Sequence, residues 1–350
     1  MKKLQLAVVG PGLIGKKHIK LIDDSDEADL CSIIAPDRAH NHDVASIYNV
    51  PLYYALEDCL AEQKLDGVII SSPNQFHYEQ AAVCIRAGIP VLIEKPVTAD
   101  LAQGESLVQL AKLHNAKALV GHHRTYSPIL KAARTVINSG RLGRLVSVIG
   151  SAQFYKPDQY FKDGPWRAEP GGGPILINLI HEVGNLRTLV GEIMSVQAVA
   201  SSNIRTFPVE DTVAMNFIFR NGALGTFLLS DTAATPKSWE QTSRENPSYP
   251  NYTDEDCYTI AGTKGSISIP TMRIKYYPEG TQPSWWNAFE EEVLSIPRVD
   301  PLQCQLEHFI NVIKGKEMPL VSVEDGFRNL LITEAIKKSI QTKTVVEIPE

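Results

Sequence analysis

The feature that most constrains the fold is a regular alternation of short apolar runs with longer helix-like stretches over residues 4–121. The run 67–71 reads Gly-Val-Ile-Ile-Ser, which is typical of a strand that is buried on both faces. Helices between such strands allow all the strands to run parallel. The sequence therefore predicts a parallel α/β sheet with strands at 4–9, 30–35, 67–71, 91–94 and 118–121 and helices at 14–23, 42–48, 56–62, 76–87 and 101–114.

After about residue 124 the pattern changes, because strand-like segments become frequent and helices become rare. We therefore expect an α+β second domain with a large, mostly antiparallel open sheet. The predicted strands are 145–154, 195–202, 212–219, 225–230, 258–261 and 273–277, and the predicted helices are 128–139, 176–189, 301–314 and 323–341. The polar stretch 235–256 is predicted to form a surface loop, and Trp285 and Trp286 are expected to pack beneath a loop rather than cap a cleft.

Composition places the chain among globular proteins and limits the classes of molecule that it is expected to bind. The 350 residues suffice for two domains, at roughly 150 residues for each. The formal net charge of −6 argues against a nucleic-acid partner and favours a small molecule. Five scattered cysteines without metal-ligand spacing predict reduced thiols and no metal. No apolar run is long enough for a membrane span and no cleavage site follows the first residues, so we expect a cytoplasmic protein without a membrane partner.

The strongest local motif is Gly10-x-Gly12-x-x-Gly15, at the junction of the first predicted strand and helix. The first glycine permits a tight turn, the second lets the backbone approach a pyrophosphate, and the third lets helix and strand pack closely. Leu13 and Ile14 lie inside the motif. The place of the glycine motif, at the junction of the first predicted strand and helix, favours a dinucleotide site over an ordinary glycine turn.

Whether the dinucleotide is NAD or NADP depends on the end of the second predicted strand. A carboxylate there binds the ribose diol of NAD and repels a 2′-phosphate. Asp37 could accept the ribose hydrogen bonds. Arg38 could instead pair with a 2′-phosphate while Asp37 begins the next helix, so both cofactors stay open.

Two further patterns suggest catalysis. Lys95 follows the fourth predicted strand in Glu94-Lys95-Pro96, and strand carboxyl ends of such a sheet face the ligand crevice. Desolvation beneath a nicotinamide ring would lower a lysine pKa enough for proton transfer, although an ordinary ion pair with Glu94 is the alternative. Further along, Asn178 and His181 follow three glycines at a spacing that places them on one helix face.

These features, in this order, resemble the family of glucose–fructose oxidoreductase, inositol dehydrogenase and the rhizopine-catabolism oxidoreductases (Gfo/Idh/MocA). The motifs that carry the resemblance are the glycine motif, Ser72-Pro73-Asn74 with His77, Ala87-Gly88, Glu94-Lys95-Pro96, Gly121-His122-His123-Arg124, Gly171-Gly172-Gly173 with His181, and 321–326. The resemblance implies a Rossmann dinucleotide-binding domain over 1–124. It also implies an α+β substrate-binding and oligomerisation domain over 125–350, whose last helix is able to pack back on the first domain.

By resemblance, substrates are sugars, polyols or cyclic alcohols that lie between the domains over the nicotinamide. Lys95 would shuttle the proton of the reacting hydroxyl, and His181 would be its acid/base or orienting partner. The implied cofactor contacts are Gly10, Gly12, Leu13, Ile14, Gly15, Asp37, Arg38, Ser72, Pro73, Asn74, His77, Glu94 and Lys95. The implied substrate contacts are His123, Arg124, Tyr126, Tyr155, Trp166, Arg167, Asn178 and His181.

One departure from the family pattern is Ile177, which stands where many family dehydrogenases carry an aspartate. No carboxylate at that point can tune Lys95 or fix the tautomer of His181, and the amide of Asn178 cannot accept a proton. Arg124 and Arg167 could grip an anionic substrate, form structural ion pairs or touch the cofactor.

The sequence thus predicts an NAD(P)-dependent dehydrogenase or reductase acting on a secondary alcohol or ketone. Two alternatives are a non-catalytic dinucleotide-binding regulator and a redox-neutral glycosidase or epimerase with tightly held NAD. By resemblance, the open sheet would form a homodimer or homotetramer.

Overall fold

In the computed structural model, which describes residues 2–349, the chain divides into two compact units. Unit 1 comprises Met1–His123 and Leu302–Leu330, and unit 2 comprises Arg124–Pro301 and Leu331–Glu350. The segment Leu302–Leu330, which the sequence pattern places in the second domain, therefore belongs with the first unit.

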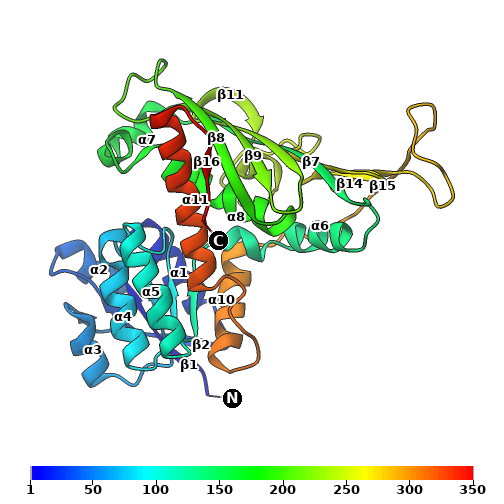
Figure 1. The fold of residues 1–350 in the computed structure, drawn as a ribbon. Coiled ribbons are helices and arrows are strands. Elements are labelled where there is room, and N and C mark those ends of the chain that lie inside the picture. The colour runs from blue at the N-terminus through cyan, green and yellow to red at the C-terminus, as the bar shows by residue number, and fades with distance from the viewer. Residues whose placement is uncertain (1, 350) are drawn as a thin grey trace. The chain divides into compact units, whose positions relative to one another are not determined.

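Unit 1 is built on a six-stranded sheet in which every neighbouring pair is parallel (Figure 1). The strands follow the spatial order β3-β2-β1-β4-β5-β6, which is that of a Rossmann sheet and confirms the predicted parallel α/β class. Their bounds are β1 (Leu4–Val9), β2 (Ala28–Ile34), β3 (Leu52–Tyr53), β4 (Gly67–Ile70), β5 (Val91–Ile93) and β6 (Ala118–Val120). Only the two-residue β3 has no counterpart among the predicted strands of this unit.

The carboxyl ends of these strands are aligned by the pairing register. Val9 of β1 pairs with both Ile34 and Ile70, Ile70 pairs with Ile93, and Ile93 pairs with Val120. The residues that directly follow these ends therefore share one edge of the sheet, called here the carboxyl row. The carboxyl row consists of Gly10, Ala35, Ser71, Glu94 and Gly121.

Helices complete unit 1, and they bury the apolar faces of the strands. The core includes Leu6, Val8 and Leu92 from strands together with Ile19 and Phe309 from helices. The helices are α1 (Leu13–Asp23), α2 (Ala39–Ile47), α3 (Leu56–Glu62), α4 (His77–Arg86), α5 (Leu101–Leu113), α10 (Pro301–Ile313) and the first residues of α11 (Val323–Thr342), with a 3₁₀ turn η1 (Asn74–Phe76) before α4.

Unit 2 contains a ten-stranded sheet in the order β15-β14-β13-β12-β7-β10-β9-β8-β16, with β11 also paired to β7. Only β7 and β10 pair in parallel, so the sheet is mostly antiparallel as predicted. The strands are β7 (Leu145–Tyr155), β8 (Ile193–Ser201), β9 (Thr212–Phe219), β10 (Leu224–Ser230), β11 (Thr232–Lys237), β12 (Tyr258–Gly262), β13 (Gly265–Ile269), β14 (Arg273–Tyr276), β15 (Glu290–Val293) and β16 (Val346–Glu347).

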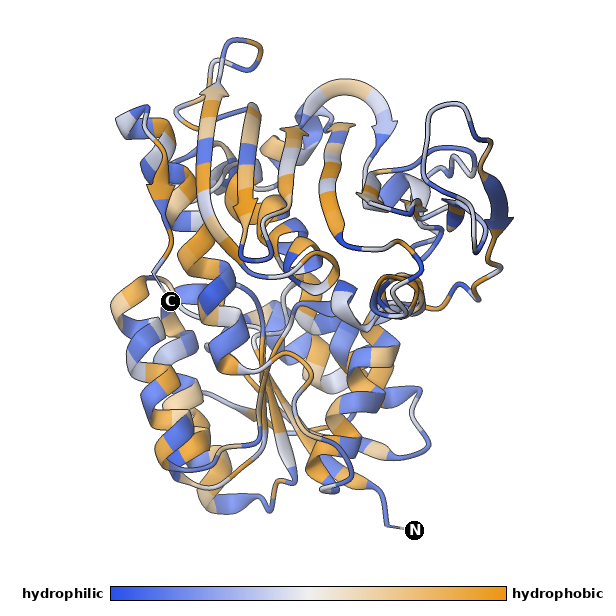
Figure 2. Ribbon diagram, turned by 45° about the vertical axis from the view of Figure 1, so that its right-hand side comes forward, coloured by the Kyte–Doolittle hydropathy of each residue, from blue (hydrophilic) through white to orange (hydrophobic). Residues whose placement is uncertain are grey.

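One face of this sheet packs on helices and the other is open. Along β9, Val213, Met215 and Phe217 are buried while Ala214 and Asn216 are exposed, which is the period of two expected for a half-buried strand. The alternation of apolar and polar positions is visible along the strands in Figure 2. The buried face packs against α6 (Pro128–Asn138), α8 (Ile180–Leu189) and the last part of α11.

Two sequence predictions for unit 2 were wrong. The stretch 235–256 is not simply a surface loop, because it contains the end of β11 and the short helix α9 (Trp239–Thr242), with Trp239 only 3% exposed. The Trp239 indole donates to Glu245 Oε2 at 2.8 Å, so a polar partner allows this segment to enter the core. Trp285 and Trp286 do not pack beneath a loop, because they are 87% and 78% exposed and their ring centroids lie 4.8 Å apart.

Candidate functional site

The three glycines of the loop between β1 and α1 have different surroundings, which explain why each position carries a glycine. Gly10 has φ +82°, and a Cβ there would lie 2.7 Å from the Cα of Ser72. A Cβ on Gly15 would lie 2.1 Å from the carbonyl oxygen of Gly10. A Cβ on Gly12 would meet nothing within 4 Å. Gly10 and Gly15 are thus required by the protein's own packing, whereas the open space at Gly12 suits the close approach of a ligand.

Helix α1 begins without a side-chain cap. Its N-cap is Gly12, no acidic residue occupies its first turn, and Leu13 is 80% exposed. The first N–H groups of this helix therefore have no capping carboxylate or hydroxyl, and a pyrophosphate would satisfy them and interact favourably with the helix dipole. The residues present fit a dinucleotide, with Gly10, Gly12, Leu13, Ile14 and Gly15 as the cradle.

Ser71, which the sequence motifs did not single out, fixes the glycine loop from the next strand. Its hydroxyl lies 2.9 Å from the Val9 carbonyl oxygen and 2.8 Å from that of Gly10, so one hydrogen is shared between them. Ser72, a predicted cofactor contact, is half-buried, and its hydroxyl donates to Gln80 Oε1 at 2.6 Å. Of the two following residues, Pro73 is exposed and Asn74 is half-buried in η1.

His77 is held inside unit 1 rather than at its surface. It is 1% exposed, with Nδ1 2.8 Å from the Pro96 carbonyl oxygen and Nε2 2.9 Å from that of Ser72. Burial lowers the pKa of His77, so the neutral ring donates one of these two hydrogen bonds at a time. His77 therefore ties the segment after β4 to the segment after β5, which favours positioning over direct contact with the cofactor.

Asp37 and Arg38 lie beyond the end of β2 and are both exposed. Asp37 Oδ1 lies 2.7 Å from His42 Nε2, and the N-cap of α2 is Arg38 without a side-chain cap bond. Asp37 therefore does not cap the next helix, so the alternative role of Asp37 at the start of α2 is excluded. Its carboxylate keeps a free oxygen for a ribose hydroxyl, and Arg38 beside it stays available to a phosphate.

Lys95 directly follows Glu94 of the carboxyl row. It is half-buried, and its backbone N–H donates to Glu94 Oε2 at 3.2 Å. The Glu94 carboxylate is 5% exposed and accepts from His18 Nε2 at 2.8 Å. Glu94 is thus buried among protein partners. Burial opposes its ionisation, whereas His18, His123 and Lys95 favour it, so its pKa lies below the ordinary value.

Arg124, a predicted substrate contact, is a buried structural residue. It is 4% exposed, and its two terminal nitrogens donate to Glu182 and Glu240. The hydroxyl of Tyr258 donates to the second oxygen of Glu182, and Asn185 Nδ2 donates to the Tyr258 oxygen at 3.0 Å. Burial raises the pKa of Glu182 to about 7 although Arg124 opposes this effect. With both terminal nitrogens engaged, Arg124 forms a structural ion pair rather than a grip for an anionic substrate.

Asn178 and His181 lie on a helix that changes its winding between them. Residues Ile175–Leu179 form a π-helical turn, and α8 continues from Ile180. Such turns are frequent at functional sites. The Oδ1 of Asn178 accepts from Lys156 Nζ at 2.7 Å, so its Nδ2 group remains as a donor pair. His181 is 6% exposed in the first turn of α8.

The remaining predicted substrate residues differ in exposure. Tyr155 at the end of β7 and Trp166 in the turn η3 (Pro165–Ala168) are each 57% exposed, whereas Tyr126 is 9% exposed and His123 is half-buried. The Arg167 guanidinium stacks 3.9 Å from the centroid of Tyr160 and donates to the Tyr160 carbonyl oxygen. Tyr155 and Trp166 are thus free to contact a ligand, while Arg167 is partly used within the protein.

Sequence reasoning missed His18, Ser71, Lys156 and Glu182. His18 lies three residues beyond the glycine motif on α1, and Ser71 stands beside the Ser72 that was chosen. Lys156 and Glu182 gave no signal, because their partners are 22 and 58 residues away in the chain. Within residues 2–349, no cluster of His, Cys, Asp and Glu side chains is arranged to hold a metal ion, and no helix is both long and apolar enough to cross a membrane.

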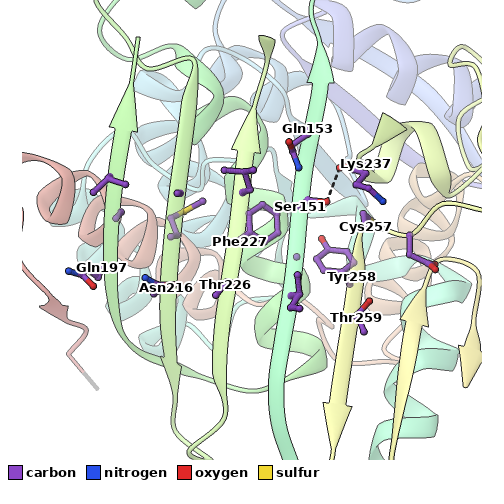
Figure 3. Close-up of a pocket in the computed structure, with 18 residues that line it drawn as sticks. Ser151, Gln153, Gln197, Asn216, Thr226, Phe227, Lys237, Cys257, Tyr258 and Thr259 are labelled. Atoms are coloured by element: carbon purple, nitrogen blue, oxygen red, sulfur yellow. Dashed lines mark hydrogen bonds between the residues drawn. The ribbon is translucent and has the colours of Figure 1, made fainter. Parts of the chain in front are cut away.

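The open face of the unit 2 sheet carries a shallow hollow of about 650 Å³ (Figure 3). Polar, uncharged side chains of β7, β8, β9, β10 and β12 line it, and the Ser151 hydroxyl donates to the Lys237 carbonyl oxygen at 3.1 Å. Exposed apolar side chains lie on the same sheet, among them Ile149 at 64% and Val199 at 63%. The labelled polar residues include Ser151, Gln153, Gln197, Asn216, Thr226 and Thr259.

The strand order of unit 1 and its uncapped glycine loop define a dinucleotide-binding protein of the Rossmann class. Comparison with known families makes this specific. Residues 4–122 match an oxidoreductase family with an NAD-binding Rossmann fold, and residues 134–348 match the C-terminal α/β domain of that family. The chain therefore belongs to the Gfo/Idh/MocA oxidoreductases and is an NAD(P)-dependent dehydrogenase or reductase.

Relatives and solved structures agree with this family. The chain is 28% identical to a 1,5-anhydro-D-fructose reductase of Ensifer adhaerens over 84% of this chain and 83% of that protein. It is 24% identical to the rhizopine catabolism protein MocA of Rhizobium meliloti over 96% and 94%. The structure of the WlbA dehydrogenase of Bordetella pertussis, in complex with NADH and UDP-GlcNAcA, has a TM-score of 0.79 at 23% identity and full coverage of both chains.

Proposed function

We propose that this protein transfers hydride between a nicotinamide cofactor and the secondary alcohol or ketone carbon of a sugar, polyol or cyclic alcohol, with Lys95 as the proton shuttle. The observation that carries the proposal is the position of Lys95 next to the carboxyl row. β1 and β5 are separated only by β4, so this row places Lys95 roughly 10 Å along the sheet edge from the glycine loop. That span suits a dinucleotide whose pyrophosphate lies at Gly12. The named activities of the reductase relative and of the inositol 2-dehydrogenases among the relatives support the substrate class.

The protein's own side chains have separate tasks in this reaction. When bound, the nicotinamide supplies the carbon that accepts or donates the hydride. The Lys95 amine hydrogen-bonds the reacting hydroxyl and takes its proton during oxidation, or returns a proton during reduction. His181 acts as the partner acid or base. Asn178 contributes donors only, because Lys156 already uses its carbonyl oxygen.

The decisive experiment replaces Lys95 by methionine, which keeps the length of the side chain and removes the amine. Reduced-nicotinamide absorbance is followed with NAD and NADP against polyols, aldoses, sugar acids and cyclic diols. We expect turnover to fall by at least about 100-fold, in line with the loss of a general base, while nucleotide affinity stays within a few fold. Lys112→Met, at an exposed lysine that pairs with Glu324, is the matched control and should retain full turnover. Undiminished turnover in Lys95→Met would remove Lys95 from the mechanism.

The same assay addresses the two alternative functions. A wild-type protein that binds nucleotide and oxidises nothing in the panel would favour another function. Nucleotide that survives purification would then support a redox-neutral reaction. Nucleotide that exchanges freely would support a regulator.

We also propose that the open face of the unit 2 sheet joins copies of this chain into a homodimer or homotetramer. Its strands expose apolar and uncharged polar side chains together, and large faces of this kind on soluble proteins mark protein contacts. Ile149→Arg places a charge in the middle strand of that face. Light scattering on a sizing column should show a smaller species for Ile149→Arg than for wild type, and an unchanged mass would exclude this face as the contact.

A further inference from the structure

The carboxylate of Glu94 is enclosed on three sides within unit 1. His18 of α1, itself 1% exposed, places Nε2 2.8 Å from Oε1. The backbone N–H of Lys95 donates to Oε2 at 3.2 Å. Gly121 after β6 closes the third side, because a Cβ there would lie 2.9 Å from Oε1. The space for this carboxylate is therefore shaped by α1, β5 and β6 together.

A buried carboxylate needs compensation, and the surroundings of Glu94 supply it. Burial by itself raises the pKa of Glu94, but the hydrogen bond from His18 and the electrostatic effects of His18, His123 and Lys95 outweigh burial, so the pKa lies below its ordinary value. Glu94 therefore stays ionised at neutral pH. On another side, His77 of α4 contacts the Pro96 carbonyl oxygen, so the Glu94-Lys95-Pro96 segment is held from several elements.

We propose that Glu94 is a positioning residue for Lys95 and that His18 holds Glu94 in place, which makes α1 and the lysine one rigid assembly. This inference rests on the proposed role of Lys95 in the reaction. The Glu94 carboxylate fixes the Lys95 peptide through its N–H and sets a negative charge beside the lysine. This positioning role takes the place of the cofactor contact that the sequence suggested for Glu94, because both carboxylate oxygens already have protein partners.

Glu94 is a buried negative charge that directly precedes Lys95 in the chain and interacts with it electrostatically, so it can tune the Lys95 amine. A carboxylate beside an ammonium stabilises the charged form. Removing the charge of Glu94 while keeping its shape should therefore lower the pKa of Lys95. A residue that only filled space would leave that pKa unchanged, which separates positioning from packing.

The test uses Glu94→Gln in the full-length protein. The amide can still accept the Lys95 N–H bond and donate to the His18 ring, so geometry is largely retained and the charge is lost. We expect nucleotide affinity within about threefold of wild type and kcat lowered by at least about tenfold. The acidic limb of the kcat/KM profile should move down by about one pH unit. A large loss of nucleotide affinity with unchanged kcat would overturn the proposal, since it would make Glu94 a cofactor contact.

His18 is tested by a pair of variants. His18→Gln keeps a donor near the position of Nε2 and should preserve most of kcat, whereas His18→Leu should reproduce the loss seen in Glu94→Gln. His308→Gln is the matched control, because His308 also contacts a carboxylate of unit 1, Glu317, at 2.6 Å. Equal kcat in wild type, His18→Gln and His18→Leu would overturn the role given to His18.

A measurement without substrate separates this inference from the proposed function. Competitive labelling with acetic anhydride at several pH values, followed by peptide mass spectrometry, gives the pKa of the Lys95 amine directly. A Lys95 pKa that is lower in Glu94→Gln than in wild type supports the inference, and an unchanged pKa overturns it. The proposed function is tested separately, by the turnover of wild type and of Lys95→Met.

Discussion

The two units bring residues from distant parts of the chain together in different ways. In unit 1, the carboxyl row collects residues that each directly follow a strand, and the parallel register alone brings them to one edge. In unit 2, Arg124, Glu182, Glu240 and Tyr258 come from four separate segments and meet through buried charge and hydrogen bonding. The first arrangement depends on backbone geometry, and the second depends on side chains that must all be present together.

This difference has an energetic consequence. A row set by register tolerates side-chain changes, because strand pairing does not depend on Lys95 or Asp37. A buried ionic cluster does not tolerate the loss of a side chain, because each charged member compensates the desolvation of the others. We therefore expect a variant of Lys95 or Asp37 in unit 1 to lose function, and a variant of the buried ionic cluster of unit 2 to lose stability.

The largest expected effect is that of Arg124→Met. It leaves the buried carboxylate of Glu182 and the half-buried carboxylate of Glu240 without their cation, so the free energy of unfolding should fall by about 3–5 kcal/mol. Urea unfolding followed by circular dichroism measures this change. Lys95→Met serves as the comparison and should alter the unfolding midpoint little. Equal midpoints for Arg124→Met and wild type would break the contrast between the units.

The second prediction compares two glycines of one loop. Gly15→Ala forces a methyl group to within 2.1 Å of the Gly10 carbonyl oxygen, so it should lower stability by about 1–3 kcal/mol and abolish nucleotide binding. Gly12→Ala has no protein atom within 4 Å, so it should keep its stability and lose only nucleotide affinity. Thermal unfolding with and without NAD distinguishes them, and a strongly destabilised Gly12→Ala would contradict this reading of the loop.

The third prediction concerns pH and the unit 2 core. Burial raises the pKa of Glu245 to about 7, against an unfolded value near 4.5. The folded state therefore binds the proton more tightly, and the stabilisation is full below the unfolded pKa and is lost as pH rises through about 7. Glu245→Gln should remove this dependence, so the Tm difference between variant and wild type should grow in favour of the variant from pH 5 to pH 8. A constant difference across this range would exclude Glu245 as the source.

The smallest effect is expected at the choice of cofactor. Asp37→Ala removes an acceptor for the ribose diol and a repulsion toward a 2′-phosphate, so kcat/KM should fall for NAD and rise for NADP, each within about tenfold. Arg38→Ala should lower kcat/KM for NADP instead. The ratio of the two kcat/KM values is the measurement, and an unchanged ratio in both variants would place cofactor choice elsewhere.

Much of unit 1 could be predicted from the sequence because local patterns decide it. Strand 4–9 and helix 56–62 were predicted with their observed bounds, and the glycine motif follows β1 as expected. The carboxyl row then follows from parallel pairing, since the residues after consecutive parallel strands meet at one edge. Only β3, which has two residues, is too short to produce a pattern.

Unit 2 was less predictable for physical reasons. The spacing of Asn178 and His181 predicts one helix face, but the π-helical turn changes the rotation between them, and no residue preference announces such a turn. For Arg124 the family resemblance implied a substrate contact and left a structural ion pair open. Its acidic partners lie 58 and 116 residues away, so no local pattern could decide between the two roles. The stretch 235–256 is rich in polar residues and was therefore predicted to be a surface loop. The Ser127 hydroxyl donates a hydrogen bond to Glu245, and this partner allows the Glu245 side chain to be buried.

The edge strand β15 consists of Glu290, Glu291, Glu292 and Val293, and the glutamates are partly or fully exposed. An unpaired strand edge is a template on which further strands of other molecules can add. Charged side chains cover this edge, because Glu292 pairs with Arg141 and Glu291 lies 3.6 Å from Lys275, and an added strand would have to desolvate them. The charged edge of this sheet therefore opposes the open-ended addition of strands from other molecules, and so the growth of fibres.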